Sequence, residues 1–320
     1  MRHSGDTRAR REGGRTKPAA ERVNLYDEVT SRIIAELEAG RFPWVQPWDA
    51  SPNLPRNALS GRRYSGVNVL LLWAAAIEGA YPSQSWLTFR QALEAGGNVR
   101  KGERGTTVVY ADRFIPEAEK ARAAQSGDAA RAIPFLKRFT VFNVAQCEGL
   151  REGLMGDPEP RPEPDIIPHA EALIQATGAD FRIGGGEAYY SQSGDYVAVP
   201  PRSAFADAND FYDTAFHELS HWTGHPMRLA RDMGNRSDMK KYGREELVAE
   251  ISASFIGAAL GLVPTVRHAD YAGFWLGILR EDNRAIFRAA SQASKAADYI
   301  LAFDETRRAA NDDELPLTGG

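Results

Sequence analysis

Apolar residues in the first half of the chain follow the spacings of short helices and strands. From residue 23 to 40 an apolar side chain stands at every fourth position, which predicts an amphipathic helix ending at Gly40. Two further helices are expected at 68–79 and 88–95, and two strands at 106–110 and 138–144. Between the two strands, residues 117–131 are expected to form an exposed excursion. Together they predict an α+β domain over residues 22–155.

A proline-rich segment follows this domain. Residues 156–168 hold five prolines among acidic residues, a composition that favours extended backbone and indicates a linker. Beyond it, residues 169–305 predict a mainly helical domain with a small sheet, so the expected fold class of the whole chain is α+β. The ends, 1–21 and 306–320, have few large apolar residues and are expected to be a disordered basic arm and a polar tail.

Composition narrows the class of protein without specifying a function. A formal net charge of −4 in 320 residues argues against a protein whose whole surface is positively charged, but it is compatible with a local basic surface. The single cysteine, Cys147, excludes an internal disulfide framework and a cysteine-based zinc cluster. The most apolar run, 69–77, is too short to span a membrane, and no apolar signal segment follows the basic start. We therefore expect a cytoplasmic protein with no membrane partner.

Two of the six histidines form a metal-binding pattern. The segment 210–222 has an apolar stripe at helical spacing, with His217 and His221 one turn apart on an adjacent face. Glu218 lies beside them, placed to contact a water rather than the ion. This HExxH pattern predicts a site for Zn²⁺, or for another divalent metal, in which Glu218 is the general base of a metallopeptidase. A purely structural role in ion pairs or helix capping is the alternative interpretation.

A catalytic zinc needs a third protein ligand, for which the sequence offers two candidates. Glu246 and Glu250 stand one turn apart on a second expected helix. Glu246 could complete a His-His-Glu site, with Glu250 holding a ligand imidazole from behind. His225, four residues beyond His221, is the alternative ligand. We favour Glu246.

Other residues near this pattern carry less specific predictions. Glu245 is expected to be a solvated surface carboxylate. Tyr242 is a candidate donor to a developing oxyanion, with a packed or surface tyrosine as the alternative. The hairpin expected from arms 188–191 and 195–199 would offer an edge strand to an extended peptide, or would be purely structural.

Two sets of motifs resemble a known family. HELSHWTGH at 217–225 and EELVAE at 245–250 resemble the zincin-like metallopeptidase domain of ArdC-type antirestriction proteins, carried by conjugative plasmids. The second motif is also similar to the ExxAD motif of gluzincins, with Glu where Asp is usual. The first half resembles the ArdC N-terminal domain, also found in TraC-type plasmid primases, through the motifs LEAG, FPW, GVN, WLTF and VRKG.

The resemblance implies an N-terminal domain that binds single-stranded DNA and a protein that protects incoming plasmid DNA from restriction. Binding of single strands uses aromatic stacking surfaces beside basic groups that follow the backbone. The candidates in the first half are Trp44, Trp48, Tyr64, Trp86, Arg62, Arg63, Arg100, Lys101 and Arg104. For each tryptophan, a place in the core is the alternative.

Two functions therefore fit the sequence. The first is a zinc metallopeptidase delivered to single-stranded DNA, which cleaves a protein there or a host restriction component. The second is a non-proteolytic protector that coats single-stranded DNA while the metal stabilises the fold. The presence of Glu218 favours the first, because a structural zinc site has no need of a base.

Overall fold

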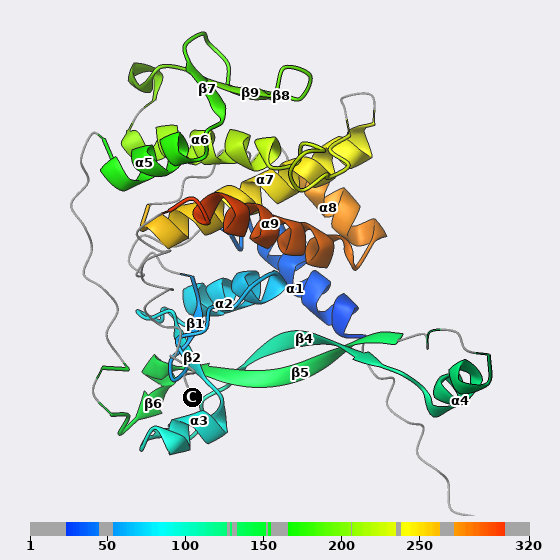
Figure 1. The fold of residues 1–320 in the computed structure, drawn as a ribbon. Helices are drawn as coiled ribbons and strands as arrows, with labels where there is room; N and C mark the ends of the chain where they lie inside the picture. The colour runs from blue at the N-terminus through cyan, green and yellow to red at the C-terminus, as the bar shows by residue number, and fades with distance from the viewer. Residues whose placement is uncertain are drawn as a thin grey trace, which may run out of the picture.

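The structure is a computed structural model of the chain, and it describes residues 24–44, 54–126, 129, 133–151, 153–154, 166–205, 207–234, 238–262 and 272–304. The expected basic arm and polar tail, Trp48 and most of the expected linker lie outside these residues. Figure 1 shows the elements in successive layers. A small sheet lies at one end, followed by the helices α6 (Ala208–Trp222), α7 (Met239–Leu260) and α9 (Ala285–Leu301). Next come α1 (Leu25–Glu38) and α2 (Val67–Glu78), and after them the long ribbon of β4 (Thr106–Phe114) and β5 (Ile133–Asn143).

A four-stranded sheet with the order β1-β2-β5-β4 forms the frame of the first half. Its strands are β1 (Arg56–Asn57), β2 (Ser85–Leu87), β4 (Thr106–Phe114) and β5 (Ile133–Asn143). The β1–β2 pair is parallel and the other pairs are antiparallel. Beside this sheet the short strands β3 (Asn98–Val99) and β6 (Cys147–Glu148) pair with each other, and a 3-10 turn, η1 (Val144–Gln146), links β5 to β6.

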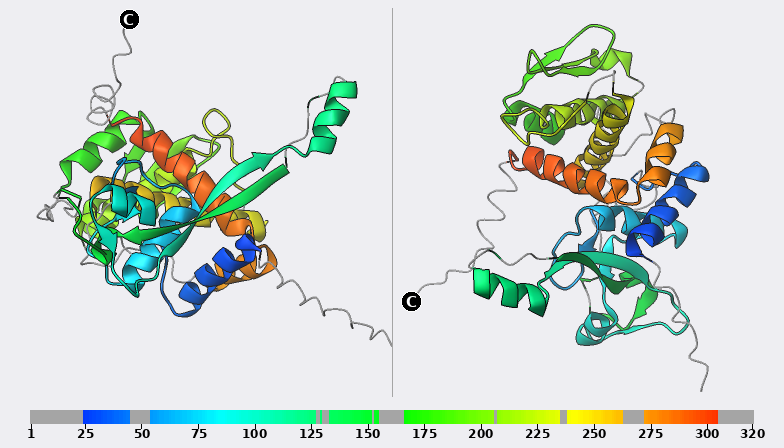
Figure 2. Two further views of the ribbon diagram at one scale, coloured as in Figure 1. Left: turned by 90° about the horizontal axis from the view of Figure 1, so that it is seen from below. Right: turned by 90° about the vertical axis from the view of Figure 1, so that its right-hand side faces the viewer.

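The strands β4 and β5 form a ribbon that is longer than the sequence predicts. Its register runs from Thr106 opposite Val141 to Phe114 opposite Ile133. At the far end the chain forms the helix α4 (Glu117–Ser126), which stands away from the rest of the molecule (Figure 2). The expected excursion between the strands is thus confirmed, and its first part is helical.

The three helices expected in the first half are confirmed as α1 (Leu25–Glu38), α2 (Val67–Glu78) and α3 (Phe89–Glu94). Two of them begin at capping side chains. The side chain of Asn24 accepts a hydrogen bond from the Tyr26 backbone N–H, and that of Thr88 accepts one from Gln91. The helix α2 is buried along most of its length, because apolar residues surround it and both β4 and α9 pack against it.

The second half is mainly helical with a three-stranded sheet of order β7-β9-β8. Its elements are α5 (Pro168–Ala176), β7 (Asp180–Ile183), β8 (Tyr189–Ser191), β9 (Tyr196–Val199), η2 (Arg202–Ala204), α6 (Ala208–Trp222), α7 (Met239–Leu260), α8 (Ala272–Glu281) and α9 (Ala285–Leu301). The strands β8 and β9 form the expected hairpin, which leaves β8 at the sheet's edge. The sheet lies over α6, against which β8 and β9 pack.

One hydrophobic cluster joins the two halves of the chain. Ile33 of α1 belongs to the same cluster as Trp275 of α8 and Ile286 of α9. The ring of Trp44 lies 5.5 Å from that of Trp275, measured between centroids. Figure 2 shows α1 alongside α8, and the Thr30 hydroxyl donates to the Asn283 carbonyl at 2.6 Å. The segments before and after the proline-rich stretch therefore bury apolar surface against each other.

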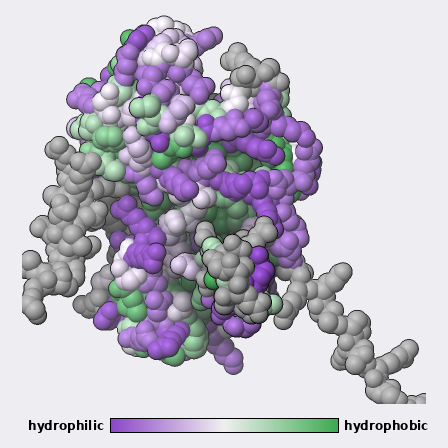
Figure 3. All heavy atoms as spheres, turned by 45° about the vertical axis from the view of Figure 1, so that its right-hand side comes forward, coloured by the Kyte–Doolittle hydropathy of each residue, from purple (hydrophilic) through white to green (hydrophobic). Residues whose placement is uncertain are grey.

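The outer surface is polar over most of the face drawn in Figure 3, with smaller hydrophobic patches between hydrophilic residues. Among the described helices, none has the length and hydropathy needed to cross a membrane.

Candidate metal centre

The helix α6 carries both histidines of the HExxH pattern into the interior. It begins at Asp207, whose carboxylate accepts a hydrogen bond from the Asp210 N–H. His217 and His221 follow one turn apart, and their ring centroids are 4.9 Å from each other. Both are buried, with 4% and 8% of their surface exposed. Helical spacing has therefore placed two imidazoles side by side, as the sequence predicts.

The helix α7 packs across α6 and brings Glu246 between the two rings. One Glu246 oxygen lies 3.5 Å from Nε2 of His217, and the other lies 3.5 Å from Nε2 of His221. One candidate ligand atom from each residue can be chosen so that all three lie within 4.8 Å of one another. Two imidazole nitrogens and a carboxylate oxygen are a donor set that suits a divalent metal, and their convergence fits such an ion.

Each histidine also has a carboxylate behind it. Nδ1 of His217 lies 3.5 Å from an oxygen of Glu250, and Nδ1 of His221 lies 3.2 Å from an oxygen of Glu245. A carboxylate in this position holds a proton on Nδ1 and leaves Nε2 as the electron-pair donor. The two carboxylates therefore orient both Nε2 atoms toward Glu246.

Glu245 does not lie on the surface as the sequence suggests; only 4% of the residue is exposed. Its carboxylate accepts hydrogen bonds from Arg231 Nε at 3.1 Å and from an Arg231 terminal nitrogen at 2.6 Å. The expectation failed because α6 and α9 both pack against α7, and every residue from Glu245 to Ala258 is buried. A helix covered on several sides offers no solvent-facing side for a charged residue.

Charges around the site shift the pKa values of its residues in opposite directions. Burial disfavours charge on His217, yet hydrogen bonds that its imidazole donates to Glu246 and Glu250 raise its pKa well above the ordinary value. Burial also raises the pKa of Glu246, but the hydrogen bond with His217 and the charges of both imidazoles lower it to about 2. Together these shifts favour a protonated His217 beside an ionised Glu246. A metal ion would have to displace that proton.

Glu218 lies next to this group without joining it. It is 8% exposed, and its negative charge contributes to the raised pKa of His217. Its carboxylate makes no hydrogen bond or ion pair with any residue that the structure describes, and so it is available to a small molecule at the site.

The two remaining candidates near the pattern occupy different positions. His225 lies outside the converging group, and its Nδ1 accepts a hydrogen bond from the Met227 N–H at 3.2 Å. Tyr242 lies one turn before Glu246 on α7, and a hydrogen bond from its side chain helps to lower the pKa of Glu246. The geometry thus brings Glu246, rather than His225, to the two histidines.

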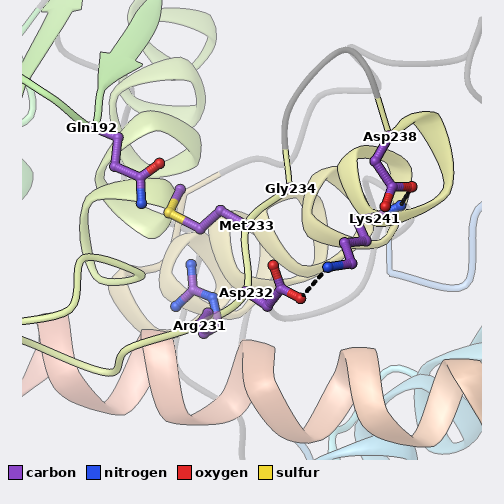
Figure 4. Close-up of a pocket in the computed structure, with 7 residues that line it drawn as sticks. All are labelled: Gln192, Arg231, Asp232, Met233, Gly234, Asp238 and Lys241. Atoms are coloured by element: carbon purple, nitrogen blue, oxygen red, sulfur yellow. Dashed lines mark hydrogen bonds and ion pairs between the residues drawn. The ribbon is translucent and has the colours of Figure 1, made fainter.

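A pocket of about 390 Å³ opens beside Arg231, the residue that holds Glu245. Figure 4 shows its lining residues, which come from the β8–β9 turn, the segment after α6 and the start of α7: Gln192, Arg231, Asp232, Met233, Gly234, Asp238 and Lys241. Lys241 and Asp232 form an ion pair at 2.7 Å along one wall. Because Arg231 also holds Glu245, the pocket wall and the support of His221 share one side chain.

The β8–β9 hairpin is fixed to the end of α6 by Arg228. Its guanidinium lies 4.0 Å from the centre of the Trp222 ring and donates to the Trp222 carbonyl at 2.6 Å. It also donates to both carboxylate oxygens of Asp195 in the hairpin and to the hydroxyl of Tyr190. The edge strand β8 is therefore held at a defined position relative to the HExxH helix.

The proposed DNA-contacting aromatics are less accessible than the sequence suggests. Trp44 and Trp86 are fully buried, each with 0% exposure, so neither ring can stack on a base in this fold. Both tryptophans occupy the alternative place in the core, where α8 covers Trp44 through Trp275 and α2 covers Trp86. Tyr64 is partly buried, and burial raises the pKa of its hydroxyl.

The basic candidates are all on the surface. Arg62 and Arg63 lie in the exposed loop before α2, and Arg100, Lys101 and Arg104 lie in the turn between β3 and β4. Of these, Arg100 is paired with Glu103 at 2.8 Å. The aromatics that are exposed in this half are different ones, among them Phe89 (51%), Tyr110 (57%) and Phe139 (47%).

Arg231 and Glu245 are the site residues that the sequence reasoning did not identify. Their contacts join three segments that are distant in the chain, so no local spacing reveals the pair. The run from Leu247 to Leu260 does hold a signal, because it contains only apolar and small residues apart from Glu250. Such a run indicates burial on all sides and would have placed the neighbouring carboxylates inside.

Two family profiles match the chain, one in each half. Residues 23–142 match the N-terminal domain of anti-restriction factor ArdC. Residues 168–292 match a zincin-like metallopeptidase. Residues 166–168, the described end of the proline-rich segment, adjoin the start of the second match.

Relatives with curated sequences match most of the chain. An uncharacterized protein of Sinorhizobium fredii, y4eC, is 40% identical over 289 residues, which cover 88% of this chain and 92% of that protein. Two DNA primases TraC of Escherichia coli are 36% and 35% identical over 88% of this chain. The chain spans only 27% and 20% of the length of these primases.

Solved structures agree over the same extent. The metal-free crystal structure of antirestriction ArdC protein from the R388 plasmid has a TM-score of 0.75 and 42% identity, covering 88% of this chain and 98% of that one. Its Mn(II)-bound structure has a TM-score of 0.74 and 41% identity over the same shares. The expected α+β architecture is thereby confirmed. With 42% identity over nearly all of a solved ArdC, and with the N-terminal and zincin-like profiles in the same order, the chain belongs to the ArdC family.

Proposed function

We propose that this protein is an antirestriction protein of a mobile element that binds single-stranded DNA with its first half and carries a zinc-dependent peptidase site in its second. The observation that supports the peptidase most directly is the convergence of His217, His221 and Glu246, with the unengaged carboxylate of Glu218 beside them. The related ArdC of the R388 plasmid supports the antirestriction role, and the ArdC N-terminal domain supports DNA binding.

Three side chains would hold the metal: the Nε2 atoms of His217 and His221 and the carboxylate of Glu246. Glu250 and Glu245 would keep the two imidazoles in the tautomer that donates from Nε2. When bound, a divalent metal supplies Lewis-acid chemistry, lowering the pKa of a water and polarising a carbonyl group. We assign zinc on the donor set, while the Mn(II)-bound relative shows that a family member accepts manganese.

Glu218 would move the proton in this reaction. Its buried carboxylate has no competing partner among the described residues, so it can accept a proton from the attacking water and then pass it to the leaving amine. Tyr242 would donate toward a developing oxyanion from its place near Glu246. The edge strand β8 would align an extended peptide beside the site through backbone hydrogen bonds. The substrate we propose is a host restriction component or a protein bound to the transferred DNA.

The second candidate is a non-proteolytic protector in which the metal has a structural role. It is favoured by the origin of the three ligands, which come from α6 and α7, two helices packed in the core. An ion there would join the helices whether or not a peptide is cleaved. The protein would then protect single-stranded DNA from restriction by coating it.

The variant Glu218→Ala separates the two candidates. It should keep the metal and the fold while lowering hydrolysis by roughly 10²- to 10⁴-fold, because only the base is lost. We would measure plasmid transfer into a restricting recipient and, by quantitative mass spectrometry, the level of the recipient's restriction subunits. The exposed residue Glu187 provides a matched control, Glu187→Ala. Full protection by Glu218→Ala, with intact restriction subunits, would establish the non-proteolytic protector instead.

A further inference from the structure

Phe89 is a large aromatic side chain on the surface of the first half. It lies at the start of α3 and is 51% exposed, although phenylalanine is usually buried in the protein interior. Its ring packs at 66° to the ring of Phe142 on β5, with 6.5 Å between centroids. Leu93, one helical turn further along α3, is 52% exposed. The result is an exposed aromatic face with a supporting ring at its edge.

Gly105, the residue just before β4, lies against Phe142 and has no side chain. A Cβ atom at Gly105 would lie 2.3 Å from the Thr140 methyl group and 2.9 Å from the Phe142 ring. Thr140 and Phe142 lie two residues apart on β5, so their side chains share one side of the ribbon. The absence of a side chain at Gly105 therefore leaves room for the Phe142 ring, which in turn contacts Phe89.

Basic residues stand next to this aromatic face. The turn from Arg100 to Gly105 leads directly into β4, so Lys101 and Arg104 lie at the end of the ribbon where Phe142 packs. Arg100 is paired with Glu103. Lys101 and Arg104 are both exposed, and neither forms an ion pair with any residue in the described ranges. The turn thus presents two positive charges that no described carboxylate compensates.

We propose that Phe89, supported by Phe142, is a stacking platform for the bases of single-stranded DNA, and that Lys101 and Arg104 contact the adjacent phosphates. This inference rests on the DNA binding proposed above and specifies its surface. It assigns the stacking role to Phe89 in place of the buried Trp44 and Trp86. Single-stranded DNA matches both the aromatic face and the two cations, because its unpaired bases offer flat apolar rings and its backbone offers phosphates. A purely apolar protein surface would leave the two cations uncompensated.

The test uses the full-length protein and a fluorescently labelled oligothymidylate, with affinity measured by anisotropy at several salt concentrations. Phe89→Ala should weaken binding on the order of tenfold, the typical effect of losing one stacked base. Phe89→Trp should bind at least as well as the natural protein, whereas Phe89→Leu should be weak like alanine, because leucine keeps the bulk but has no ring face. Replacing Lys101 and Arg104 by alanine should make the slope of log affinity against log salt concentration shallower by about 0.7 per cation removed.

Tyr110 provides the matched control. It is 57% exposed on the same ribbon, but it lies opposite Lys137 and therefore on the other side from Phe142. Tyr110→Ala should leave affinity unchanged. Equal binding by Phe89→Ala and the natural protein, or equal loss in Phe89→Ala and Tyr110→Ala, would overturn the assignment of this surface while leaving DNA binding itself intact. Failure of the natural protein to bind the oligonucleotide would overturn the proposed DNA binding as well.

Discussion

The charged residues behind the two histidines determine how the candidate metal site is arranged. Glu245 and Glu250 each face one Nδ1 atom, and Arg231 holds Glu245 with both residues only 4% exposed at their side chains. A buried ion pair of this kind adds little net stability compared with apolar packing, but losing one partner leaves the other charge buried and uncompensated. Its main effect is therefore on the orientation of His221.

The variant Glu245→Gln should lower metal affinity by about 10- to 100-fold, which is typical of losing a partner behind a metal-bound histidine. It should also destabilise the protein by roughly 3–5 kcal/mol, because Arg231 keeps its charge in the interior. Metal affinity would be measured by competition with a chelator and stability by urea unfolding, with Glu187→Gln as the exposed control.

Replacing both partners distinguishes orientation from stability. The double variant Arg231→Met, Glu245→Met removes both charges and should regain most of the lost stability while metal affinity stays low. If metal affinity returned together with stability, the role of Glu245 would be structural only.

The HExxH residues could be predicted from sequence because they lie on one helix, where spacing alone determines which side chains are neighbours. Glu245 could not, because its partners His221 and Arg231 come from other segments and meet it only through packing. The same holds for Trp44 and Trp86, whose burial depends on helices distant in sequence. Local pattern predicts residue neighbours within an element, whereas burial depends on the assembled core.

At the scale of elements, the structure confirms the predicted helices and the β8–β9 hairpin, while β4 and β5 extend beyond the predicted strands. The strands were underestimated because the sequence of the outer part, 111–114 and 133–137, lacks the alternation of apolar and polar residues typical of a half-buried strand. The β8–β9 hairpin shows the opposite case. Its position is fixed by a specific polar contact, the pair of Arg228 with Asp195.

This contact predicts a pH dependence. The hydrogen bond from Arg228 holds the pKa of Asp195 below the ordinary 3.8 and outweighs burial, which acts to raise that pKa. A carboxyl with a lowered folded-state pKa contributes stability above its unfolded pKa and loses that contribution as pH falls through the folded value. Asp195→Asn should therefore lower the melting temperature at neutral pH. The difference should begin to shrink as the pH falls toward 3.8 and should vanish only below the lower, folded-state pKa.

Asp180 is the matched control for this prediction. It pairs with Arg182 on β7, but both side chains are about half exposed, so Asp180→Asn should change the melting temperature little at any pH. Thermal unfolding followed by circular dichroism across the acid range would measure both variants. A constant difference between the natural protein and Asp195→Asn at all pH values would exclude ionic stabilisation of the hairpin.

At the scale of the whole molecule, the hydrophobic cluster shared by the two halves determines how the protein unfolds. α1 packs on α8, and α2 packs on α9, which in turn packs on α7 with the candidate ligand Glu246. The sequence motifs indicate two domains, whereas the apolar contacts connect them. Sequence periodicity could show that α1 and α9 each have an apolar side, but not that these sides meet within one cluster.

Shortening one core residue should reveal this coupling. Ile33 in α1 is fully buried, so Ile33→Ala should destabilise the protein by roughly 2–5 kcal/mol. Because the cluster is shared, metal release and loss of helical signal should occur at one common, lowered urea concentration. Ile183→Ala, at a position 49% exposed, should leave both unchanged. Metal release at the natural midpoint in Ile33→Ala would show that the second half folds independently.

The shared cluster also bears on how this block is inherited. In the longer primases the matching segment forms only a minor part of the chain, yet it aligns with 88% of this chain and so reaches into both of this chain's family matches. A recombination event that separated the halves at the proline-rich stretch would leave Ile33 on one product and Trp275 on the other, each with its apolar partners missing. Such products would expose hydrophobic surface and tend to aggregate. Recombination between genes is therefore expected to transfer the two family domains together as one unit, with breakpoints outside that unit.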